Sequence, residues 1–358
     1  MVGLSDRRAS ASGNTLDPSR RRHALLRLTE FGGALFALSL SPAHALAGSP
    51  GVGTGPTAGQ NRLVRASFFG LARTGDTLLS CGERGLVARY TPQRSWQIER
   101  LSTARNLTAI AAHPSGLAIT VGHSGVIFVS QNFGQHWQPV PEKMRRHINP
   151  NHDAWLTVAI DADRRIVVGG AFGRMAHSAD LGKTWTAVKP LGSDFEWHIY
   201  QLSVDVSRSS WLMVGESGTL AESGNGLAWR EIPSPYAGSF FGGIITRRGS
   251  RIAFGMRGRI YRQMRGSSTW QLIEVPTTMS WMAGREFAEG QIMLVGDQGT
   301  IAVSQSDGEQ FTVQKFWEGS LADLHESPDG QLWIAGKSGL KLFKRGAEPR
   351  QPPAGGAV

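Results

Sequence analysis

The chain has 358 residues, including 45 glycines, 11 tryptophans, 15 phenylalanines and one cysteine, and its formal net charge is +10. Charged residues are only 18% and apolar residues 40% of the chain, which excludes a disordered polar chain. The many glycines and aromatic residues argue against a helical bundle and predict an aromatic-rich β core with tight turns. Cys81 has no partner for an intramolecular disulfide, and metal sites built from cysteine clusters are excluded.

Residues 1–47 predict a cleaved export signal. Six arginines and three acidic residues lie in this segment. Its apolar run, Phe31–Leu40, is too short to span a bilayer. It is followed by Ala43-His44-Ala45 and Ala45-Leu46-Ala47, which are small-residue sites of the kind that a signal peptidase accepts. The cluster Arg20–Arg22 resembles a twin-arginine signal without its usual Phe and Lys, so the general export route stays an alternative. We expect a periplasmic or thylakoid-lumen-like location.

Removal of this segment leaves a charge of about +7, carried mainly by arginine rather than lysine. Arginine suits carboxylates and phosphates because its planar fork donates paired hydrogen bonds. The charge therefore predicts an acidic protein or a lipid surface as partner. For an exported protein we expect no nucleic acid.

Seven repeats follow, each with an apolar or small residue and then Gly-x-x-Gly. They begin at Cys81, Val121, Gly169, Val214, Phe254, Val295 and Ala335. The first glycines are separated by 40, 48, 45, 40, 41 and 40 residues. A period of about 40–45 residues is typical of a four-stranded propeller blade.

Each repeat predicts strands A and B, a glycine hairpin, strand C, a second turn and strand D. The hairpin needs glycine because tight turns place residues at positive φ. An aromatic residue follows the second glycine after 11 or 12 positions, as in Trp96 and Trp137. We therefore predict an all-β fold, a seven-bladed propeller of four-stranded antiparallel blades.

The seventh repeat ends after strand C, and residues 346–358 form a Pro/Gly-rich tail that we expect to be disordered. We predict that Asn61–Ala66 supplies the missing strand, since closure removes open sheet edges. The domain boundaries are then 1–47 for the signal, 48–60 for a Gly-rich linker, 61–345 for the propeller and 346–358 for the tail.

The second turn of the third repeat contains Ser178, Asp180, Gly182 and Trp185 in the form S-x-D-x-G-x-T-W, which is the Asp-box or BNR motif. Degraded copies begin at Ser130, Ser223 and Ser304. The Asp side chain is suited to accept hydrogen bonds from turn N–H groups, while Trp packs between sheets. We interpret this motif as structural and assign no catalytic residue to it.

Together the V-G-x-x-G hairpins, the Asp-box turns and the seven units resemble the photosystem II stability/assembly factor family of BNR-like propellers. The resemblance covers nearly the whole mature chain. It implies a non-enzymatic, exported propeller that binds a protein or membrane-protein complex, assists its assembly or stability, and is at most peripheral to the membrane. We expect a monomer with no cofactor and no metal.

The alternative is a carbohydrate-active propeller, either a glycosidase or a lectin-like binder. Sialidases resemble the chain in the Asp-box turns but have six blades and a Tyr nucleophile. The four tyrosines here are Tyr90, Tyr200, Tyr236 and Tyr261, and none lies beside a Glu in a matching pattern. A glycosidase needs two carboxyl groups about 5–10 Å apart. The candidate pool is Glu83, Glu216, Asp297, Asp153, Asp194 and Glu196.

Partner contacts are expected at the channel mouth, where the glycine hairpins and the connections between blades meet. Aromatic residues that begin A strands are expected to form a hydrophobic floor there, beneath basic residues of the hairpins and long connections. The candidate partner-binding residues are Arg84, His123, Arg145, Arg146, His147, Trp155, Trp197, Phe240, Arg257, Arg259 and Trp281.

Overall fold

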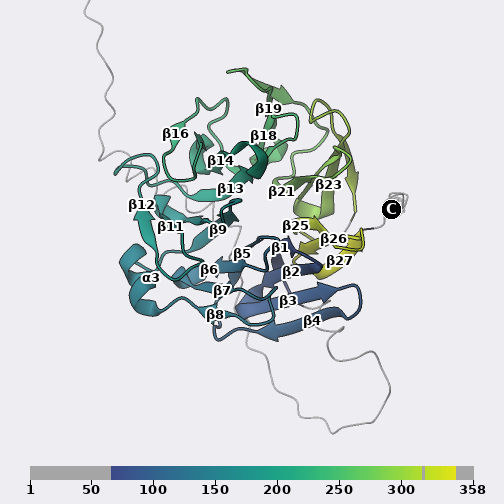
Figure 1. Ribbon diagram of the computed structural model, residues 1–358. Helices are drawn as coiled ribbons and strands as arrows, with labels where there is room; N and C mark the ends of the chain where they lie inside the picture. The colour runs from purple at the N-terminus through teal and green to yellow at the C-terminus, as the bar shows by residue number, and fades with distance from the viewer. Residues whose placement is uncertain (1–65, 317–318, 344–358) are drawn as a thin grey trace, which may run out of the picture. The chain divides into compact units, whose positions relative to one another are not determined.

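The structure is a computed structural model and describes residues 66–316 and 319–343. Seven antiparallel sheets follow one another along the chain and form a ring, in which β25 of the last blade lies beside β1 of the first (Figure 1). The predicted seven-bladed, all-β propeller is therefore confirmed. The predicted signal, linker and tail, and all of the closing segment except Ala66, lie outside the described residues.

Blades 1 to 3 each have four strands, which run in sequence order from the inner strand A to the outer strand D. Blade 1 contains β1 (Phe68–Thr74), β2 (Thr77–Gly82), β3 (Leu86–Thr91) and β4 (Ser95–Arg100). Blade 2 contains β5 (Leu107–Ala112), β6 (Ala118–Gly122), β7 (Ile127–Ser130) and β8 (Gln138–Pro139). Blade 3 contains β9 (Trp155–Ile160), β10 (Ile166–Gly170), β11 (Met175–Ser178) and β12 (Thr186–Val188).

Blades 4 to 6 repeat this order. Blade 4 contains β13 (Ile199–Asp205), β14 (Ser210–Gly215), β15 (Leu220–Ser223) and β16 (Arg230–Glu231). Blade 5 contains β17 (Phe240–Ile245), β18 (Arg251–Gly255), β19 (Ile260–Gln263) and β20 (Trp270–Ile273). Blade 6 contains β21 (Trp281–Glu286), β22 (Ile292–Gly296), β23 (Thr300–Ser304) and β24 (Thr312–Lys315).

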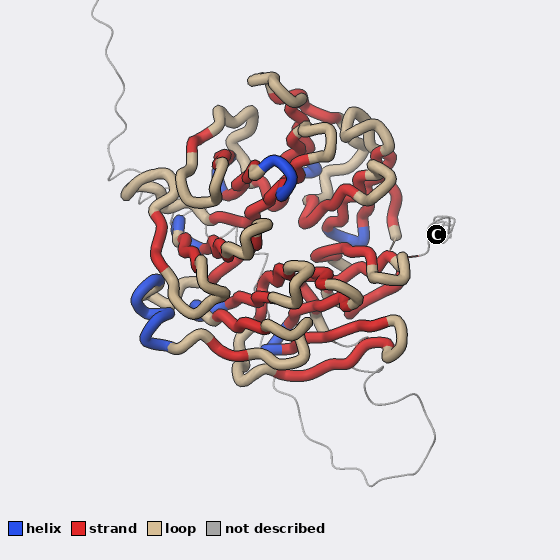
Figure 2. The backbone as a smooth tube through the Cα atoms, in the orientation of Figure 1, coloured by secondary structure: helices blue, strands red, loops and turns tan. Residues whose placement is uncertain are grey.

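Blade 7 has three strands in the described residues, namely β25 (Leu321–Glu326), β26 (Leu332–Gly336) and β27 (Gly339–Phe343). The one α-helix of the described residues, α3 (Glu142–Ile148), lies in the long connection between blades 2 and 3 (Figure 2) and was not predicted from the sequence. No described helix has the length and hydropathy needed to cross a bilayer.

Both glycines of the B–C hairpin are required, for different reasons. The hairpins of blades 1 to 6 are single 3-10 turns: η2 (Glu83–Gly85), η3 (His123–Gly125), η4 (Ala171–Gly173), η6 (Glu216–Gly218), η7 (Met256–Gly258) and η8 (Asp297–Gly299). The second glycine of blade 1, Gly85, has a φ of +75°, which favours glycine. The first, Gly82, is extended, but a Cβ there would lie 2.3 Å from the Ser67 carbonyl oxygen. The repeat motif is thus a consequence of the packing of each hairpin on strand A.

The predicted Asp-box residues of blade 3 form a hydrogen-bonded C–D turn. The Ser178 hydroxyl donates to Asp180 Oδ1 at 2.9 Å and accepts from the Gly182 N–H at 2.9 Å. Asp180 also accepts from the Thr184 N–H at 2.8 Å. The Trp185 indole donates to the Gly182 carbonyl at 3.1 Å and is buried. These contacts close the turn and place the indole in the core between blades.

The ring closes where blade 7 meets blade 1. The Leu71 N–H donates to Asp323 Oδ2 at 2.7 Å, and the Tyr90 hydroxyl donates to Asp329 Oδ2 at 2.7 Å. The indole rings of Trp96 and Trp333 meet edge to face, with their centroids 5.3 Å apart. Polar and aromatic contacts therefore join the two ends of the ring.

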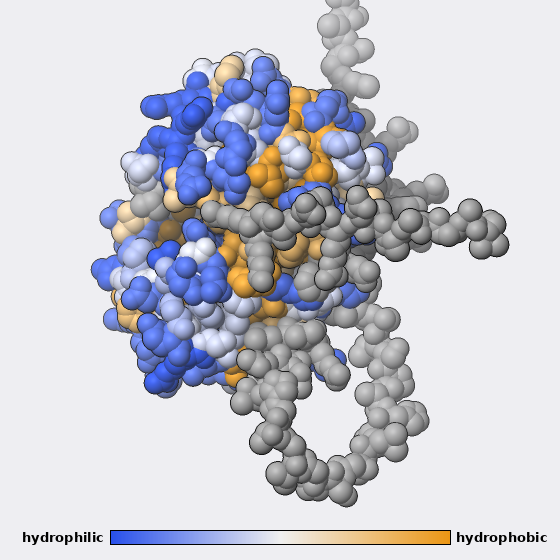
Figure 3. Space-filling model, turned by 90° about the vertical axis from the view of Figure 1, so that its right-hand side faces the viewer, coloured by the Kyte–Doolittle hydropathy of each residue, from blue (hydrophilic) through white to orange (hydrophobic). Residues whose placement is uncertain are grey.

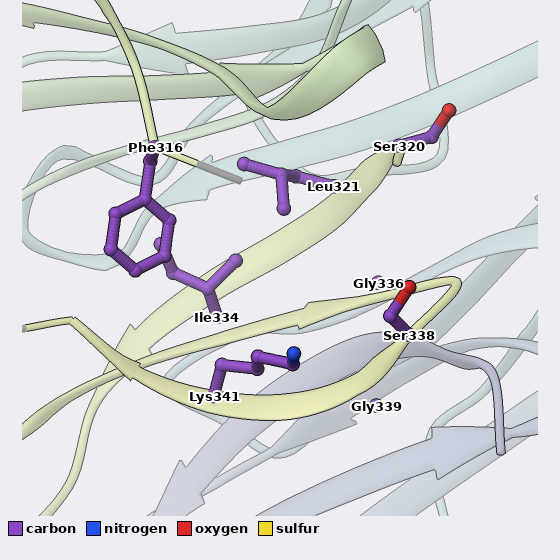
Figure 4. A pocket seen from close by; sticks show the side chains of 8 residues that line it. All are labelled: Phe316, Ser320, Leu321, Ile334, Gly336, Ser338, Gly339 and Lys341. Carbon is purple, nitrogen blue, oxygen red and sulfur yellow. The ribbon is translucent and has the colours of Figure 1, made fainter. Parts of the chain in front are cut away.

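The outer edge of blade 7 is apolar. Leu342 is 38% exposed, and Phe316 and Phe343 are half-buried with their ring centroids 4.8 Å apart. Figure 3 views this side of the propeller and shows apolar residues at the surface. Behind them lies a small pocket whose walls include Leu321, Ile334 and Lys341 (Figure 4). In the other six blades a fourth strand covers the corresponding edge.

Candidate functional site

A ring of seven β-bulges builds the mouth of the channel. In blade 1, Phe68 pairs with Gly82 and Gly70 pairs with Cys81, so the register shifts at Phe69, which is the extra residue of a β-bulge. The same register shift occurs at the start of every inner strand. Because the start of strand A pairs with the end of strand B, these bulges lie at the same end of each blade as the B–C hairpins. A bulge changes the direction of a side chain without ending the strand.

The extra residues of these bulges are half-buried, whereas the residue before each of them is buried. We call them the bulge residues: Phe69, Thr108, Leu156, Tyr200, Phe241, Met282 and Ala322. Most of them are apolar or aromatic. They therefore give the mouth an apolar lining that the sequence analysis assigned to the preceding positions.

Three aromatic candidates for partner binding are core residues, which corrects the predicted hydrophobic floor. Trp155, Phe240 and Trp281 are all 0% exposed. Trp281 donates its indole N–H to the Gly258 carbonyl at 3.1 Å, and Phe240 packs edge to face on Tyr261. The first residue of strand A points between blades, and the bulge places its successor at the mouth instead.

The hairpin candidates lie at this mouth but differ in exposure. Arg84 and Arg257 occupy the middle position of their turns, with φ values of 51° and 58°, and are exposed. His123 is half-buried, and burial together with the charge of Arg105 lowers its pKa. Arg259, one residue beyond its hairpin, is half-buried. Among the hairpin candidates, the two exposed arginines are therefore the cations that a partner can reach directly.

Three basic candidates lie on α3 and differ in their contacts. Arg145 is half-buried and donates from Nε to the Val140 carbonyl at 3.0 Å. Arg146 is exposed and forms an ion pair with Glu142 at 2.7 Å, one helical turn away. His147 is exposed. The helix thus presents its basic residues mainly to solvent, and its one acidic residue is already paired.

Four aromatic side chains form a continuous run from blade 3 to blade 5, which we call the aromatic arc. It consists of Phe172, His198, Tyr200 and Phe241. Successive ring centroids are 4.9, 6.1 and 5.3 Å apart, and all three contacts are edge to face. Phe172 is 56% exposed, which is unusual for a large apolar side chain at a hairpin tip. The candidate Trp197, next to His198 in the chain, is 36% exposed.

Glu216 holds the aromatic arc in place from the hairpin of blade 4. Its Oε2 accepts from the His198 N–H at 3.2 Å and lies 3.4 Å from His198 Nδ1. The Phe172 N–H donates to the same ring nitrogen at 3.2 Å, which connects the hairpins of blades 3 and 4 through one imidazole. Burial and the negative charge of Glu216 raise the pKa of Tyr200 to about 12. Tyr200 is therefore a neutral phenol at physiological pH.

The carboxylates proposed for a glycosidase are spread around the mouth, and three of them already form hydrogen bonds or ion pairs within the protein. Asp153 accepts from Arg174 Nε at 3.0 Å, and Asp297 accepts from the Ser320 hydroxyl at 2.9 Å. Glu216 accepts from the backbone N–H of His198 in the aromatic arc. Glu83 is half-buried, while Asp194 and Glu196 are exposed in the connection to blade 4. The described residues contain no cluster of His, Cys, Asp and Glu that is suited to bind a metal.

Sequence reasoning named Trp197 but left Phe172, His198, Tyr200 and Phe241 out of its candidates. A usable signal is the residue after the apolar residue that begins each A strand, as in Phe240-Phe241 and Ile199-Tyr200. Its alignment across the seven repeats marks the bulge position. The contact between Phe172 and His198 has no such signal, because it joins a hairpin to a connection in the next blade.

Comparison with solved structures shows the same fold at low identity. The structure described as "YCF48 bound to D1 peptide" matches with a TM-score of 0.64 and 14% identity, covering 78% of this chain and 93% of that one. YCF48 from Cyanidioschyzon merolae gives 0.62 and 12%, covering 78% and 95%. A streptogramin B lyase gives 0.67 and 12%, with the same coverage. These likenesses establish the fold alone, since the lyase is similar to the same degree.

The family of the chain is established by its sequence rather than by its fold. No curated protein sequence matches the chain. The model of the family described as photosynthesis system II assembly factor YCF48 matches residues 88–347, which is most of the propeller. The chain belongs to the YCF48 assembly factor family.

Proposed function

We propose that the protein is an exported, non-enzymatic assembly factor whose mouth binds a segment of a membrane-protein complex. The observation that carries this proposal is the aromatic arc with Trp197, a solvent-reaching aromatic surface on a rigid ring. Aromatic and arginine side chains are enriched at the energetic centres of protein interfaces. Arg84 and Arg257 flank the same mouth and offer charges for the carboxylates of a partner.

Family membership supports a protein partner. One member of the fold was solved as YCF48 bound to D1 peptide, so a propeller of this kind can bind a peptide. For this chain the peptide class is our inference, and its host complex follows from the family rather than from a residue at the mouth. Export rests on residues 1–47.

A glycosidase at the mouth is the less favoured alternative. A retaining or inverting mechanism needs two free carboxyl groups facing one bond. Asp153 is held by the Arg174 guanidinium and Glu216 by the backbone N–H of His198, and Tyr200 keeps its proton at neutral pH. A sialidase-like Tyr nucleophile is therefore not favoured here either.

The proposal is tested by capturing partners from detergent-solubilised membranes of the native organism. Wild type should retain a membrane-protein complex, while Phe172→Ala and Trp197→Ala should each retain at least fivefold less. Phe133→Ala is the matched control, because Phe133 is also an exposed phenylalanine at positive φ, in a C–D turn at the opposite end of blade 2. Equal retention by all four proteins, or no membrane protein on wild type, would contradict the proposal.

Export has its own test. Residues 1–47 fused to a reporter that folds before transport should deliver it across the membrane. Replacement of Arg20, Arg21 and Arg22 by lysine should stop delivery if the route is twin-arginine, and should leave it unchanged if the route is general. A reporter that stays inside with the native segment would overturn export altogether.

A further inference from the structure

One position in each blade faces the next blade, and the residue type at this position differs from blade to blade. We call the contact between two neighbouring blades a seam. It is the fourth residue after the second hairpin glycine. In blade 4 this residue is Glu222, which forms an ion pair with Arg251 of blade 5. In blade 5 it is Arg262, which forms a buried ion pair with Asp307 of blade 6 at 2.8 Å. Ion pairs thus fill these two seams.

In blade 1 the same position is Arg89, and it does not reach blade 2. Its guanidinium donates instead to Gln97 Oε1 of the neighbouring strand at 2.6 Å. No ion pair between described residues crosses the seam of blades 1 and 2. A cleft of about 320 Å³ lies there, within the range of roughly 300–1,000 Å³ of small-molecule sites.

The floor of the cleft is apolar and its wall is an indole. Leu79 and Val87 from blade 1 lie at the bottom, and Trp137 from the C–D turn of blade 2 lines the side. The corresponding indoles of Trp185 and Trp229 each donate to a turn carbonyl at 3.1 Å. No described residue accepts a hydrogen bond from the Trp137 indole. This N–H group and the adjoining ring face are therefore available to a ligand.

The rim supplies hydrogen-bonding groups of both signs. Gln97, Glu99 and Arg89 come from blade 1, and Gln135 and His136 from blade 2. Burial raises the pKa of Glu99, although His136 and Arg89 partly offset that effect. The Glu99 carboxylate and the Arg89 guanidinium lie on the paired strands β4 and β3 of blade 1 and balance each other in charge, so the rim favours neither a cationic nor an anionic ligand.

We propose that the cleft between blades 1 and 2 binds a neutral sugar ring of a glycan without hydrolysing it. A pyranose presents an apolar C–H face to the Trp137 indole and hydroxyl groups to Gln97, Glu99 and Gln135. Charge balance argues against a lysine- or arginine-rich peptide, because Arg89 offsets the attraction that Glu99 alone would exert on it. Only one carboxyl group lines the cleft, and glycoside hydrolysis uses two.

The site is separate from the mouth. β3 runs from the hairpin end of blade 1 toward the opposite end, and Arg89 lies in its second half. The C–D turn that carries Gln135 and Trp137 also belongs to that opposite end. A sugar bound here leaves the aromatic arc uncovered, so this inference stands or falls independently of the peptide-binding proposal.

The experiment uses the full-length chain on an array of neutral and anionic oligosaccharides, with a lysine-rich peptide as cationic probe. Neutral glycans bound by wild type are then titrated by calorimetry. We expect Trp137→Leu and Gln135→Ala to weaken binding at least tenfold and threefold, and Glu99→Ala at least fivefold. Glu231→Ala is the matched control, an exposed glutamate on the outer strand of blade 4, and should bind as wild type does.

Thermal melts show whether each variant is folded, and Gln135→Ala, in an exposed turn, tests the site even if Trp137→Leu is unstable. The proposal is overturned if wild type binds no neutral glycan, if it binds only anionic glycans or the lysine-rich peptide, or if the cleft variants bind as tightly as Glu231→Ala does. Release of new reducing ends from a bound glycan would overturn the non-hydrolytic part.

Discussion

At the scale of single residues, Asp180 links the stability of the third blade to pH. Burial acts to raise the pKa of this carboxyl, but hydrogen bonds from Thr184 and Ser178 outweigh it and hold the pKa below its ordinary value. A group with a depressed folded-state pKa stabilises the fold above its unfolded pKa of about 3.9, and this contribution disappears as pH falls through the folded value.

We therefore expect Asp180→Asn to lower the free energy of unfolding at pH 6 by about 1–2 kcal/mol, and the gap to wild type to shrink from pH 5 to pH 3. Urea unfolding at each pH measures this. Asp163→Asn is the control, because Asp163 is exposed in the A–B turn of the same blade. A gap that stays constant or widens on acidification would show that the turn does not depend on the ionised carboxylate.

The buried ion pair between Arg262 and Asp307 provides a second test at this scale. Both side chains are about 5% exposed, and Asp307 Oδ2 also accepts from the Ser250 hydroxyl at 2.6 Å. Removal of Asp307 leaves the buried Arg262 guanidinium with only the exposed Glu309, at 3.5 Å, as counter-charge. Breaking a buried ion pair in this way typically costs about 3–5 kcal/mol.

Asp307→Asn should therefore destabilise the protein by about 3 kcal/mol, and its asparagine suits the φ of +53° at this position. Addition of Arg262→Met should recover part of the loss, because the buried charge is then gone. Urea unfolding of the two variants and wild type measures both steps. A double variant less stable than Asp307→Asn would contradict the explanation.

The sequence predicts the residues of the mouth to within one position, because a bulge shifts the pairing of strands A and B by one residue. The repeats place an apolar or aromatic residue at the start of each inner strand, and this prediction holds for Trp155, Phe240 and Trp281. Alternation alone could not show that a bulge follows, because the bulge depends on pairing with strand B rather than on a local propensity. The half-buried residues that reach the mouth are therefore Leu156, Phe241 and Met282, one residue beyond the prediction.

At the scale of elements, the pocket of blade 7 matches a position that other blades fill with their outer strand. Val140, Ile232 and Ile273 are buried there in blades 2, 4 and 5. In blade 6, Phe316 lies two residues further along strand D by register, packs against the core cluster of blades 6 and 7, and donates its N–H to the Gly299 carbonyl at 2.8 Å. Phe316 stands four residues before Ser320, whose carbonyl accepts from the hairpin N–H of Lys337.

Ser67 is the residue of blade 1 that is equivalent to Ser320, since its carbonyl accepts from the hairpin N–H of Glu83 at 2.9 Å. The residue four positions before Ser67 is Leu63. By analogy with blade 6, we predict that Leu63 enters the pocket beside Leu321 and Ile334 (Figure 4). Within the predicted closing segment, Asn61–Ala66, Leu63 is therefore the side chain that we expect to anchor the segment to blade 7.

Leu63→Asp should lower the free energy of unfolding by about 2–4 kcal/mol, from lost burial and a charge placed in an apolar pocket. Chemical unfolding of the full-length chain measures the change, and Val52→Asp, in the predicted linker, is the control. If both variants unfold with wild type, another segment or none fills the pocket.

The strands were predictable where they repeat, because seven copies of one pattern reinforce one another. The helix α3 occurs once and has seven residues, with Pro141 before it and Glu142 in its first turn. These are ordinary helix-start signals, but they are short and lie in a long connection. The blades were predicted from a pattern that recurs along the chain. The helix occurs once, so no recurring pattern marks it in the sequence.

At the scale of the whole molecule, the ring separates two surfaces of different chemistry. The mouth is built from hairpins and bulges, and the cleft of blades 1 and 2 from a C–D turn and an outer strand. Adjacent blades are fixed by side-chain bonds between inner strands, for example from the Ser203 hydroxyl to the Gly243 carbonyl at 2.6 Å. Coupling between two sites requires an element with two arrangements that both ligands bias. A closed ring of packed sheets supplies no such element among the described residues.

We therefore expect the two sites to act independently. A saturating neutral oligosaccharide should change the amount of membrane complex captured by wild type less than twofold. Trp137→Leu should capture the complex as wild type does, and Phe172→Ala should bind the oligosaccharide with unchanged affinity. A fivefold change in either direction, about 1 kcal/mol of coupling, would show instead that the blades transmit a rearrangement from one end of the ring to the other.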